Sequence, residues 1–182
     1  MGWASALGVI ICLAGGSASA AVTVFGGGQA EHCFKAALAG KADDDSIRIC
    51  DLALATDDLV PADRGGTLIN RGVMRLRRGQ LAAAQADLDA GVTLNPAVGD
   101  GWLDRGAVLV AQRHYHDGLT DIDKAIGLGV REPAKAYYNR AIAEEGLDDE
   151  KAAYFDYQRA LALKPGWELP QKELLRFTVT ER

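Results

Sequence analysis

The sequence has no excess of positive charge, and its first part has no charge at all. Residues 1–20 contain no Asp, Glu, Lys or Arg, so all 20 basic and 25 acidic residues follow them. The net charge is −5 and the pI is near 5.2. Phosphate binding needs clustered Lys and Arg, which this sequence lacks, so we expect no nucleic-acid partner.

Motifs that carry catalysis are also missing. Gly26–Gly28 precedes an expected helix, but no Lys-Ser or Lys-Thr follows, so it is interpreted as a flexible connector instead of a phosphate loop. No Gly-x-Ser-x-Gly elbow is present, and Cys33 has no placed His partner. The Asp-x-Asp pairs at 87–89 and 121–123 are expected to be solvated, because side chains two apart on a helix diverge. We expect a protein without enzymatic activity and without a cofactor.

The one metal-like spacing is His114-x-His116-Asp117. Two imidazoles and a carboxylate could hold a divalent ion, but the sequence fixes no fourth ligand and places the group in a polar turn. We therefore expect no metal site. A metal-dependent enzyme that uses His114 and His116 remains a lesser alternative.

The uncharged start of the chain has the pattern of a signal peptide. The apolar run Ala6–Ala14 is too short to span a bilayer, and small residues follow it, ending in Ala18-Ser19-Ala20. We expect residues 1–20 to be removed after Ala20 and the protein to be periplasmic or exported. A basic residue near Met1 is lacking, so an uncleaved apolar anchor is the alternative.

A fixed period runs through the rest of the chain. Asn70-Arg71-Gly72 recurs as Asp104-Arg105-Gly106 and as Asn139-Arg140-Ala141, at offsets of 34 and 35 residues. Apolar residues within each period follow helical spacing, and two breaks divide it. Each period is therefore expected to be a helical hairpin.

These units resemble the tetratricopeptide repeat (TPR) family and, more specifically, small exported bacterial TPR proteins. Large residues stand at Leu68, Trp102 and Tyr137, and small residues stand at Gly72, Gly106 and Ala141, where the helices of a hairpin cross. The resemblance implies an all-α right-handed superhelix of stacked hairpins with a C-terminal capping helix. The expected parts are an irregular lead at 21–28, then a TPR domain at 29–182 with hairpins at about 29–58, 62–96, 98–131 and 133–165 and a capping helix at about 167–177.

The resemblance also implies a concave groove that binds a segment of another protein. The function we expect is that of a non-catalytic adaptor or scaffold of the bacterial cell envelope; the alternative is a self-associating structural protein with a filled groove. Asp100 and Asp104 stand where a carboxylate clamp needs basic or amide groups, so no such clamp is expected. The chain's own residues 21–25 could dock in the groove; the alternative is that they pack elsewhere or form a disordered start of the mature chain. Its expected lining is Ile69, Asn70, Val73, Leu76, Leu103, Asp104, Ala107, Val110, Tyr138, Asn139 and Ile142.

Two sets of contacts follow from the repeat register. Cys33 and Cys50 remain after signal-peptide removal, one on each helix of the degenerate first hairpin, and are expected to form a disulfide. Each repeat also carries an Arg followed 16 residues later by an Asp, which predicts three ion pairs: Arg71 with Asp87, Arg105 with Asp121, and Arg140 with Asp156.

Overall fold

The computed structural model describes residues 22–23 and 28–177. All regular structure in this part of the chain is helical, which confirms the all-α fold class. The helices are α1 (Gln29–Leu38), α2 (Asp44–Thr56), α3 (Pro61–Arg77), α4 (Leu81–Leu94), α5 (Gly99–Ala111), α6 (Tyr115–Leu128), α7 (Pro133–Gly146), α8 (Glu150–Leu163) and α9 (Glu168–Leu174). Residues 1–20, the expected signal peptide, lie outside the described residues.

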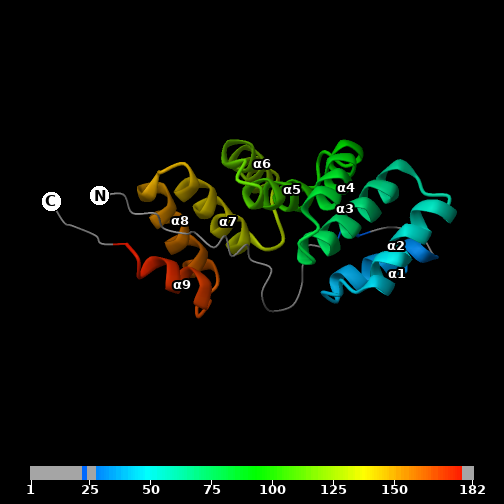
Figure 1. Cartoon of the computed structure of the whole chain (residues 1–182), viewed down its shortest axis with the longest axis horizontal. Coiled ribbons are helices and arrows are strands. Elements are labelled where there is room, and N and C mark those ends of the chain that lie inside the picture. The colour runs from blue at the N-terminus through cyan, green and yellow to red at the C-terminus, as the bar shows by residue number, and fades with distance from the viewer. Residues whose placement is uncertain (1–21, 24–27, 178–182) are drawn as a thin grey trace.

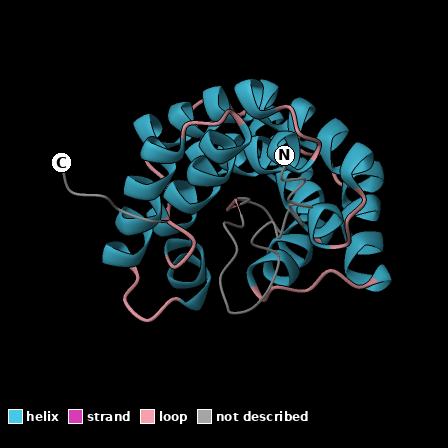
Figure 2. Ribbon diagram, turned by 60° about the vertical axis from the view of Figure 1, so that its left-hand side comes forward, coloured by secondary structure: helices cyan, strands magenta, loops and turns pink. Residues whose placement is uncertain are grey.

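The helices form hairpins that stack along the chain. α1 packs on α2, α3 on α4, α5 on α6 and α7 on α8, in one row from α1 to α9 (Figure 1). The first helices also contact one another between hairpins, α1 with α3, α3 with α5 and α5 with α7. The row therefore curves with these first helices on its inner side, and the helices follow an arc (Figure 2).

Local sequence explains where the helices begin. Asp43 precedes α2, and its side chain accepts a hydrogen bond from the backbone N–H of Ser46 at 2.8 Å. Asp149 does the same for α8 through the N–H of Ala152, at 3.0 Å. Pro61 opens α3, where its missing N–H costs nothing. These residues satisfy or remove backbone donors that a helix start leaves unpaired.

The turn inside each hairpin has a left-handed residue at the equivalent position. The backbone φ is 76° at Gly40, 71° at Gly79, 65° at Arg113 and 62° at Asp148. Glycine adopts this conformation freely, whereas Arg113 and Asp148 do so at a cost of about 1–2 kcal/mol. The turn geometry is therefore set by the hairpin packing, even where the sequence has lost its glycine.

Small residues are required where the two helices of a hairpin cross. A Cβ on Gly106 would lie 2.7 Å from Cγ1 of Ile122 and 3.0 Å from the backbone oxygen of Gly118. A Cβ on Gly118 would lie 2.7 Å from Cγ2 of Val110. The two backbones approach so closely that even a methyl group would push the helices apart.

The three predicted arginine–aspartate pairs are all present, and each arginine also bridges two hairpins. The Arg Nε to Asp Oδ2 distance is 2.8, 2.6 and 2.5 Å in the successive repeats. The Nη1 atom of each arginine contacts an aspartate on the second helix of the preceding hairpin, at 2.6, 3.3 and 2.8 Å. The pairs are Arg71 with Asp87 and Asp51, Arg105 with Asp121 and Asp89, and Arg140 with Asp156 and Asp123.

The expectation that both Asp-x-Asp pairs are solvated was wrong for one member of each. Asp87 and Asp121 are buried, with 4% of each residue exposed. Each lies between the helices of its hairpin, where the guanidinium compensates the loss of hydration. Asp89 and Asp123 are exposed, with about half of each side chain accessible at 50% and 54%. The two residues of a pair diverge as expected, but one of them points inward.

The two ends of the stack are stabilised by different interactions. At the C-terminal end, Trp167, Leu169, Leu174 and Phe177 pack on the apolar cluster around Tyr138. The helix α9 is shorter than the expected range 167–177. Trp167 and Phe177 still pack outside the helix, because covering the last hairpin requires their side chains and not a longer helix.

At the N-terminal end, a disulfide joins the helices of the least regular hairpin. Cys33 and Cys50 are bonded as predicted, with their Cα atoms 4.8 Å apart. Both cysteines are fully buried and pack in a cluster with Ala37 and Met74. The helices α1 and α2 lie within the range of about 29–58 that was expected for this hairpin. No helix among the described residues has the length and apolar character needed to cross a bilayer.

Candidate functional site

The residues expected to line the groove lie on the inner helices and are mostly inaccessible. Their helical spacing puts Ile69, Val73 and Leu76 on one face of α3, with corresponding residues on α5 and α7. Asp104 and Ile142 are half-buried. The buried members are Ile69, Asn70, Val73, Leu76, Leu103, Ala107, Val110, Tyr138 and Asn139.

One described residue from outside the repeats contacts this face. The backbone N–H of Val22 donates to Oδ1 of Asn70 at 2.7 Å, and Nδ2 of Asn70 donates to the carbonyl oxygen of Val22 at 2.9 Å. Val22 is 8% exposed and belongs to the apolar cluster of Ile69, Val73 and Leu76. Asn70 thus satisfies both backbone groups of Val22, while the side chain of Val22 packs in the apolar cluster.

This contact matches the expectation that the chain's own N-terminal segment docks in the groove, as far as the described residues extend. Val22 is bound, and Thr23 next to it is exposed. Ala21, Val24 and Phe25 lie outside the described residues. Among the expected groove residues, Asn70 is the one whose side chain bonds to Val22.

Asp104 differs sharply from Asn70, although both occupy the same place in their repeats. Its Oδ2 atom is buried and has no hydrogen-bond partner. Burial raises the pKa of Asp104 to about 8, and the nearby charge of Asp100 adds to the rise. A carboxyl group in this state is either protonated or available to a cation that enters the groove.

Three basic side chains lie near Asp104, but they donate hydrogen bonds to other groups. Nε of Arg131 donates to Asp100 at 2.7 Å, and Nζ of Lys135 donates to Glu132 at 2.7 Å. Arg77 donates to the backbone oxygens of residues 37 and 41, at 3.4 and 3.3 Å. These cations lower the pKa of Asp104 without bonding to it.

A second unusual carboxyl lies on the same helix as Asn139. Oε2 of Glu144 on α7 is buried without a hydrogen-bond partner. Burial raises the pKa of Glu144 to about 7, and Asp156 contributes to the rise. Nε of Arg140 is 3.9 Å from Glu144, and this cation lowers the pKa but is already engaged by Asp156.

We expect Glu144→Gln to change how stability depends on pH. A carboxyl with a raised pKa in the folded state stabilises the fold most at low pH, and this contribution is lost as pH rises through about 7. The glutamine variant should therefore gain stability relative to the parent as pH increases from about 5 to about 8. Thermal unfolding across this range measures the difference.

The control is Glu150→Gln, because Glu150 is an exposed residue at the start of α8. The difference in thermal stability between this control variant and the parent should vary little over the same pH range. Equal pH dependence in the parent and the Glu144→Gln variant would show that the carboxyl does not titrate with folding.

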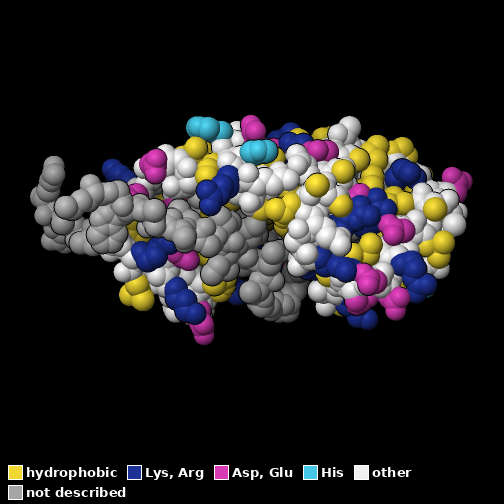
Figure 3. Space-filling model, viewed as in Figure 1, with side chains coloured by type: hydrophobic (Ala, Val, Ile, Leu, Met, Phe, Trp, Pro, Cys, Tyr) yellow, Lys and Arg dark blue, Asp and Glu magenta, His cyan; other side chains and the backbone are white. Residues whose placement is uncertain are grey.

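The histidines do not build a site in the described structure. His114, His116 and Asp117 are exposed in and after the turn between α5 and α6. Histidine side chains are visible at the upper surface in Figure 3, over the region where Figure 1 shows α6. Among residues 22–23 and 28–177, no group of three or more His, Cys, Asp or Glu side chains is arranged to hold a metal ion.

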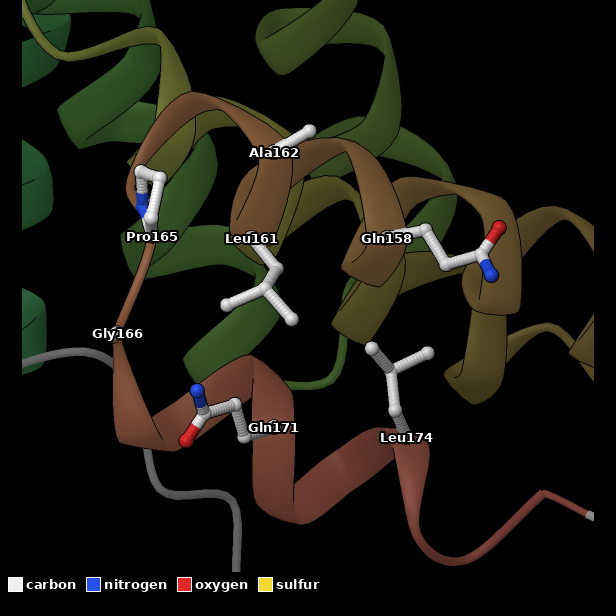
Figure 4. Close-up of a pocket in the computed structure, with 7 residues that line it drawn as sticks. All are labelled: Gln158, Leu161, Ala162, Pro165, Gly166, Gln171 and Leu174. Atoms are coloured by element: carbon white, nitrogen blue, oxygen red, sulfur yellow. The ribbon is translucent and has the colours of Figure 1, made fainter.

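A hollow of ≈ 460 Å³ lies between α8 and α9. Figure 4 shows Leu161 and Leu174 pointing toward each other across it, with Gln158 and Gln171 near its rim. The remaining lining comes from Ala162, Pro165 and Gly166, so no charged side chain lines it. The hollow offers apolar contact but no group that would orient a ligand.

The sequence did not indicate that Oδ2 of Asp104 is buried without a hydrogen-bond partner. The exchange of Asn for Asp at position 104 is visible when the repeats are aligned, since Asn70 and Asn139 occupy the equivalent positions. The burial of Asp104 without a partner depends on where Arg77, Arg131 and Lys135 direct their hydrogen bonds. For Glu144, no feature of the aligned repeats indicated a buried carboxyl without a hydrogen-bond partner.

These features define a TPR-like superhelix of stacked helical hairpins, with Val22 bound to Asn70 on its inner face. The family-model scan and the comparison with curated proteins both find no match. Solved structures do match. The crystal structure of MamA has a TM-score of 0.63 at 20% identity, covering 78% of this chain and 80% of that one.

Two further structures give the same result. The Arabidopsis OM64 TPR domain matches with a TM-score of 0.58 at 22% identity, over 64% of this chain and 98% of that chain. A MamA RS-1 ArsTM double mutant matches with a TM-score of 0.64 at 20% identity, over 81% and 82% of the two chains. At this level of identity the similarity establishes a TPR-like fold.

Proposed function

We propose that this protein is a non-catalytic adaptor that binds an extended segment of a partner protein in its inner groove. The observation that carries the proposal is the pair of hydrogen bonds between Asn70 and the backbone of Val22. Backbone recognition of this kind tolerates different side chains, and the apolar strip beneath it favours apolar ones. Asn139 offers the same side-chain chemistry at the equivalent position of α7.

We further propose that the protein works outside the cytoplasm, in the bacterial cell envelope. The uncharged segment 1–20 with its small-residue end supports export. The Cys33–Cys50 disulfide also supports it, because structural disulfides persist in oxidising compartments. In this setting the partner is another envelope protein or an exported segment.

Site-specific crosslinking in the native envelope tests the groove. A photoreactive phenylalanine at Ile142, which is half-buried on the inner face, should capture the partner. The same group at Phe155, which is 55% exposed on α8, serves as the control and should not. Asn139→Ala should weaken the capture at position 142 about two- to tenfold, the effect of losing a typical hydrogen bond.

Capture at position 155 alone, or capture that is insensitive to Asn139→Ala, would contradict groove binding. The second candidate is self-association, in which the groove holds a segment of another copy. Size-exclusion chromatography and mass spectrometry of the crosslinked product separate the two, because self-association gives a product of twice the chain mass.

A further inference from the structure

Asp104 lies in the middle of a row of side chains whose first member binds backbone. Asn70, Asp104 and Asn139 occupy the equivalent place on α3, α5 and α7, and each of these inner helices contacts the next. Asn70 bonds to both backbone groups of Val22, through Oδ1 at 2.7 Å and Nδ2 at 2.9 Å. The row therefore offers one polar side chain per repeat to an extended segment.

The carboxyl group of Asp104 faces the inner side of the stack. Arg77 on α3 and Lys135 on α7 both act on it, which places it between the inner helices of the neighbouring repeats. Arg105, the next residue of α5, points the other way and donates to carboxylates on α6 and α4. Oδ2 of Asp104 is buried without a hydrogen-bond partner in the described part of the chain, but the residue as a whole is half-buried. A docking segment can therefore reach this group and satisfy it.

The surrounding charges favour an uncharged ligand for this carboxyl. Charged side chains face it from three sides, and they are Arg77 on α3, Asp100 on its own helix, and Arg131, Glu132 and Lys135 at and before the start of α7. The cations among them outnumber the anions, so a basic side chain of a partner would meet repulsion once Asp104 is protonated. A backbone amide has no net charge and avoids this repulsion.

A protonated carboxyl group has the hydrogen-bonding capacity that this task needs. Its O–H donates and its second oxygen accepts, as Nδ2 and Oδ1 of Asn70 do toward Val22. Ionisation removes the donor and would place a carboxylate oxygen against the carbonyl oxygen of the segment. Only the protonated form of Asp104 can make both bonds.

We propose that Asp104 is the central backbone-binding residue of the groove, where its carboxylic acid group holds one residue of the partner's extended segment by both backbone groups. The inference rests on the adaptor function proposed above and specifies how that segment is bound. Packed helices lie about 8–10 Å apart and an extended residue spans about 3.3–3.6 Å, so successive positions of the row meet roughly every third residue of the segment. Because Val22 occupies Asn70, the partner segment binds at Asp104 and Asn139.

Binding at this position depends on pH. Burial raises the pKa of Asp104 to about 8, and the nearby charge of Asp100 adds to the rise. The group is therefore largely protonated at pH 7 and largely ionised at pH 9, and the protonated form is the one that binds. Raising the pH from 7 to 9 should weaken binding of the segment about tenfold, because the protonated fraction falls by about that factor.

The test uses capture by the photoreactive phenylalanine at position 142, in native envelopes brought to pH 7 and to pH 9. In the parent, the yield of crosslinked product below saturation should be about tenfold lower at pH 9. Asp104→Asn should match the parent at pH 7 and keep its yield at pH 9, because its amide donates at both pH values. This variant should fold, since asparagine stands at the equivalent positions 70 and 139.

Two further variants separate the hydrogen bonds from the charge. Asp104→Leu removes both, so its yield should be about two- to tenfold below that of Asp104→Asn at either pH. Asn139→Ala is the matched control, because it weakens capture but should leave the ratio between pH 7 and pH 9 as in the parent. Thermal unfolding at both pH values shows that the variants compared are folded.

Two results would overturn the inference. The first is parent capture that stays constant between pH 7 and pH 9, or that changes as much in Asp104→Asn as in the parent. The second is capture that increases with pH, which would mean that the carboxylate binds a cation of the partner. Both leave the adaptor function intact, whereas absence of capture at position 142 at every pH would remove the adaptor function and this inference with it.

Discussion

Replacing Arg105 with alanine should lower the free energy of unfolding by about 2–4 kcal/mol, less than for a fully buried pair because solvent screens part of the interaction. Asp121 is the reason for this large effect. Its side chain is 6% exposed, and Arg105 donates to both of its oxygens, at 2.6 and 2.8 Å. Without the guanidinium, a buried carboxylate has to stay unpaired or take up a proton. The guanidinium also lies 4.5 Å from the Trp102 ring centroid, so its packing is lost as well.

Chemical denaturation of the parent and the variant measures this change. Arg48→Ala is the control, because Arg48 and Asp45 form an exposed pair with 77% and 81% of their side chains accessible. Its effect should stay near 0–1 kcal/mol, the usual range for a surface ion pair.

The double variant Arg105→Met with Asp121→Leu separates the unpaired charge from the lost contacts. Because it removes both charges, it should recover much of the stability lost in Arg105→Ala. If Arg105→Ala costs no more than Arg48→Ala, the buried pair does not hold the hairpin together.

The arginine pairs also show why the fold could be predicted from the sequence. Each repeat places its Arg and Asp 16 residues apart, and a helical hairpin of this length brings positions at that spacing together across its two helices. The same register places small residues such as Gly106 and Gly118 at the crossing. These features are local to one repeat, so a period in the sequence is sufficient to locate them.

Contacts between repeats were not predictable in the same way. The second partners of the arginines, such as Asp89 for Arg105, depend on how one hairpin sits on the next. The burial of Asp104 depends on how α3, α5 and α7 pack together. Arg131 bonds to Asp100 and not to Asp104, which also depends on the packing between repeats. The sequence therefore did not predict the protonation state of Asp104, and the proposed groove remains a prediction.

The contact between Val22 and Asn70 is an intermediate case. A row of amide and carboxylate groups at positions 70, 104 and 139 indicated where an extended backbone could bind, and Val22 binds at the first of them. The sequence offered no means of choosing among the three positions. The structure shows that Val22 binds Asn70.

The second large effect is expected from removing the disulfide. The bond closes a loop of 17 residues, for which the chain-entropy relation gives about 3 kcal/mol of stabilisation. In a stack of repeats each hairpin contacts only its neighbours, so the loss should fall mainly on α1 and α2. We therefore expect the variant Cys33→Ala with Cys50→Ala to exchange its α1 and α2 amide hydrogens at least about tenfold faster, while α5 to α8 stay protected as in the parent.

Hydrogen exchange followed by mass spectrometry measures this regional effect, and the reduced parent protein is the matched control because it lacks the bond but keeps the sulfur atoms. Reduction and substitution should destabilise the same helices. The alanine variant should be somewhat less stable than the reduced parent, because the fully buried cysteines also fill space in the cluster with Met74. Uniform loss of protection from α1 to α8 would instead mean that the stack unfolds as one cooperative unit. The first hairpin also packs on α3, the helix that carries Asn70. Opening this hairpin should therefore loosen the hold of Asn70 on Val22, and protection of the Val22 amide is expected to fall together with that of α1.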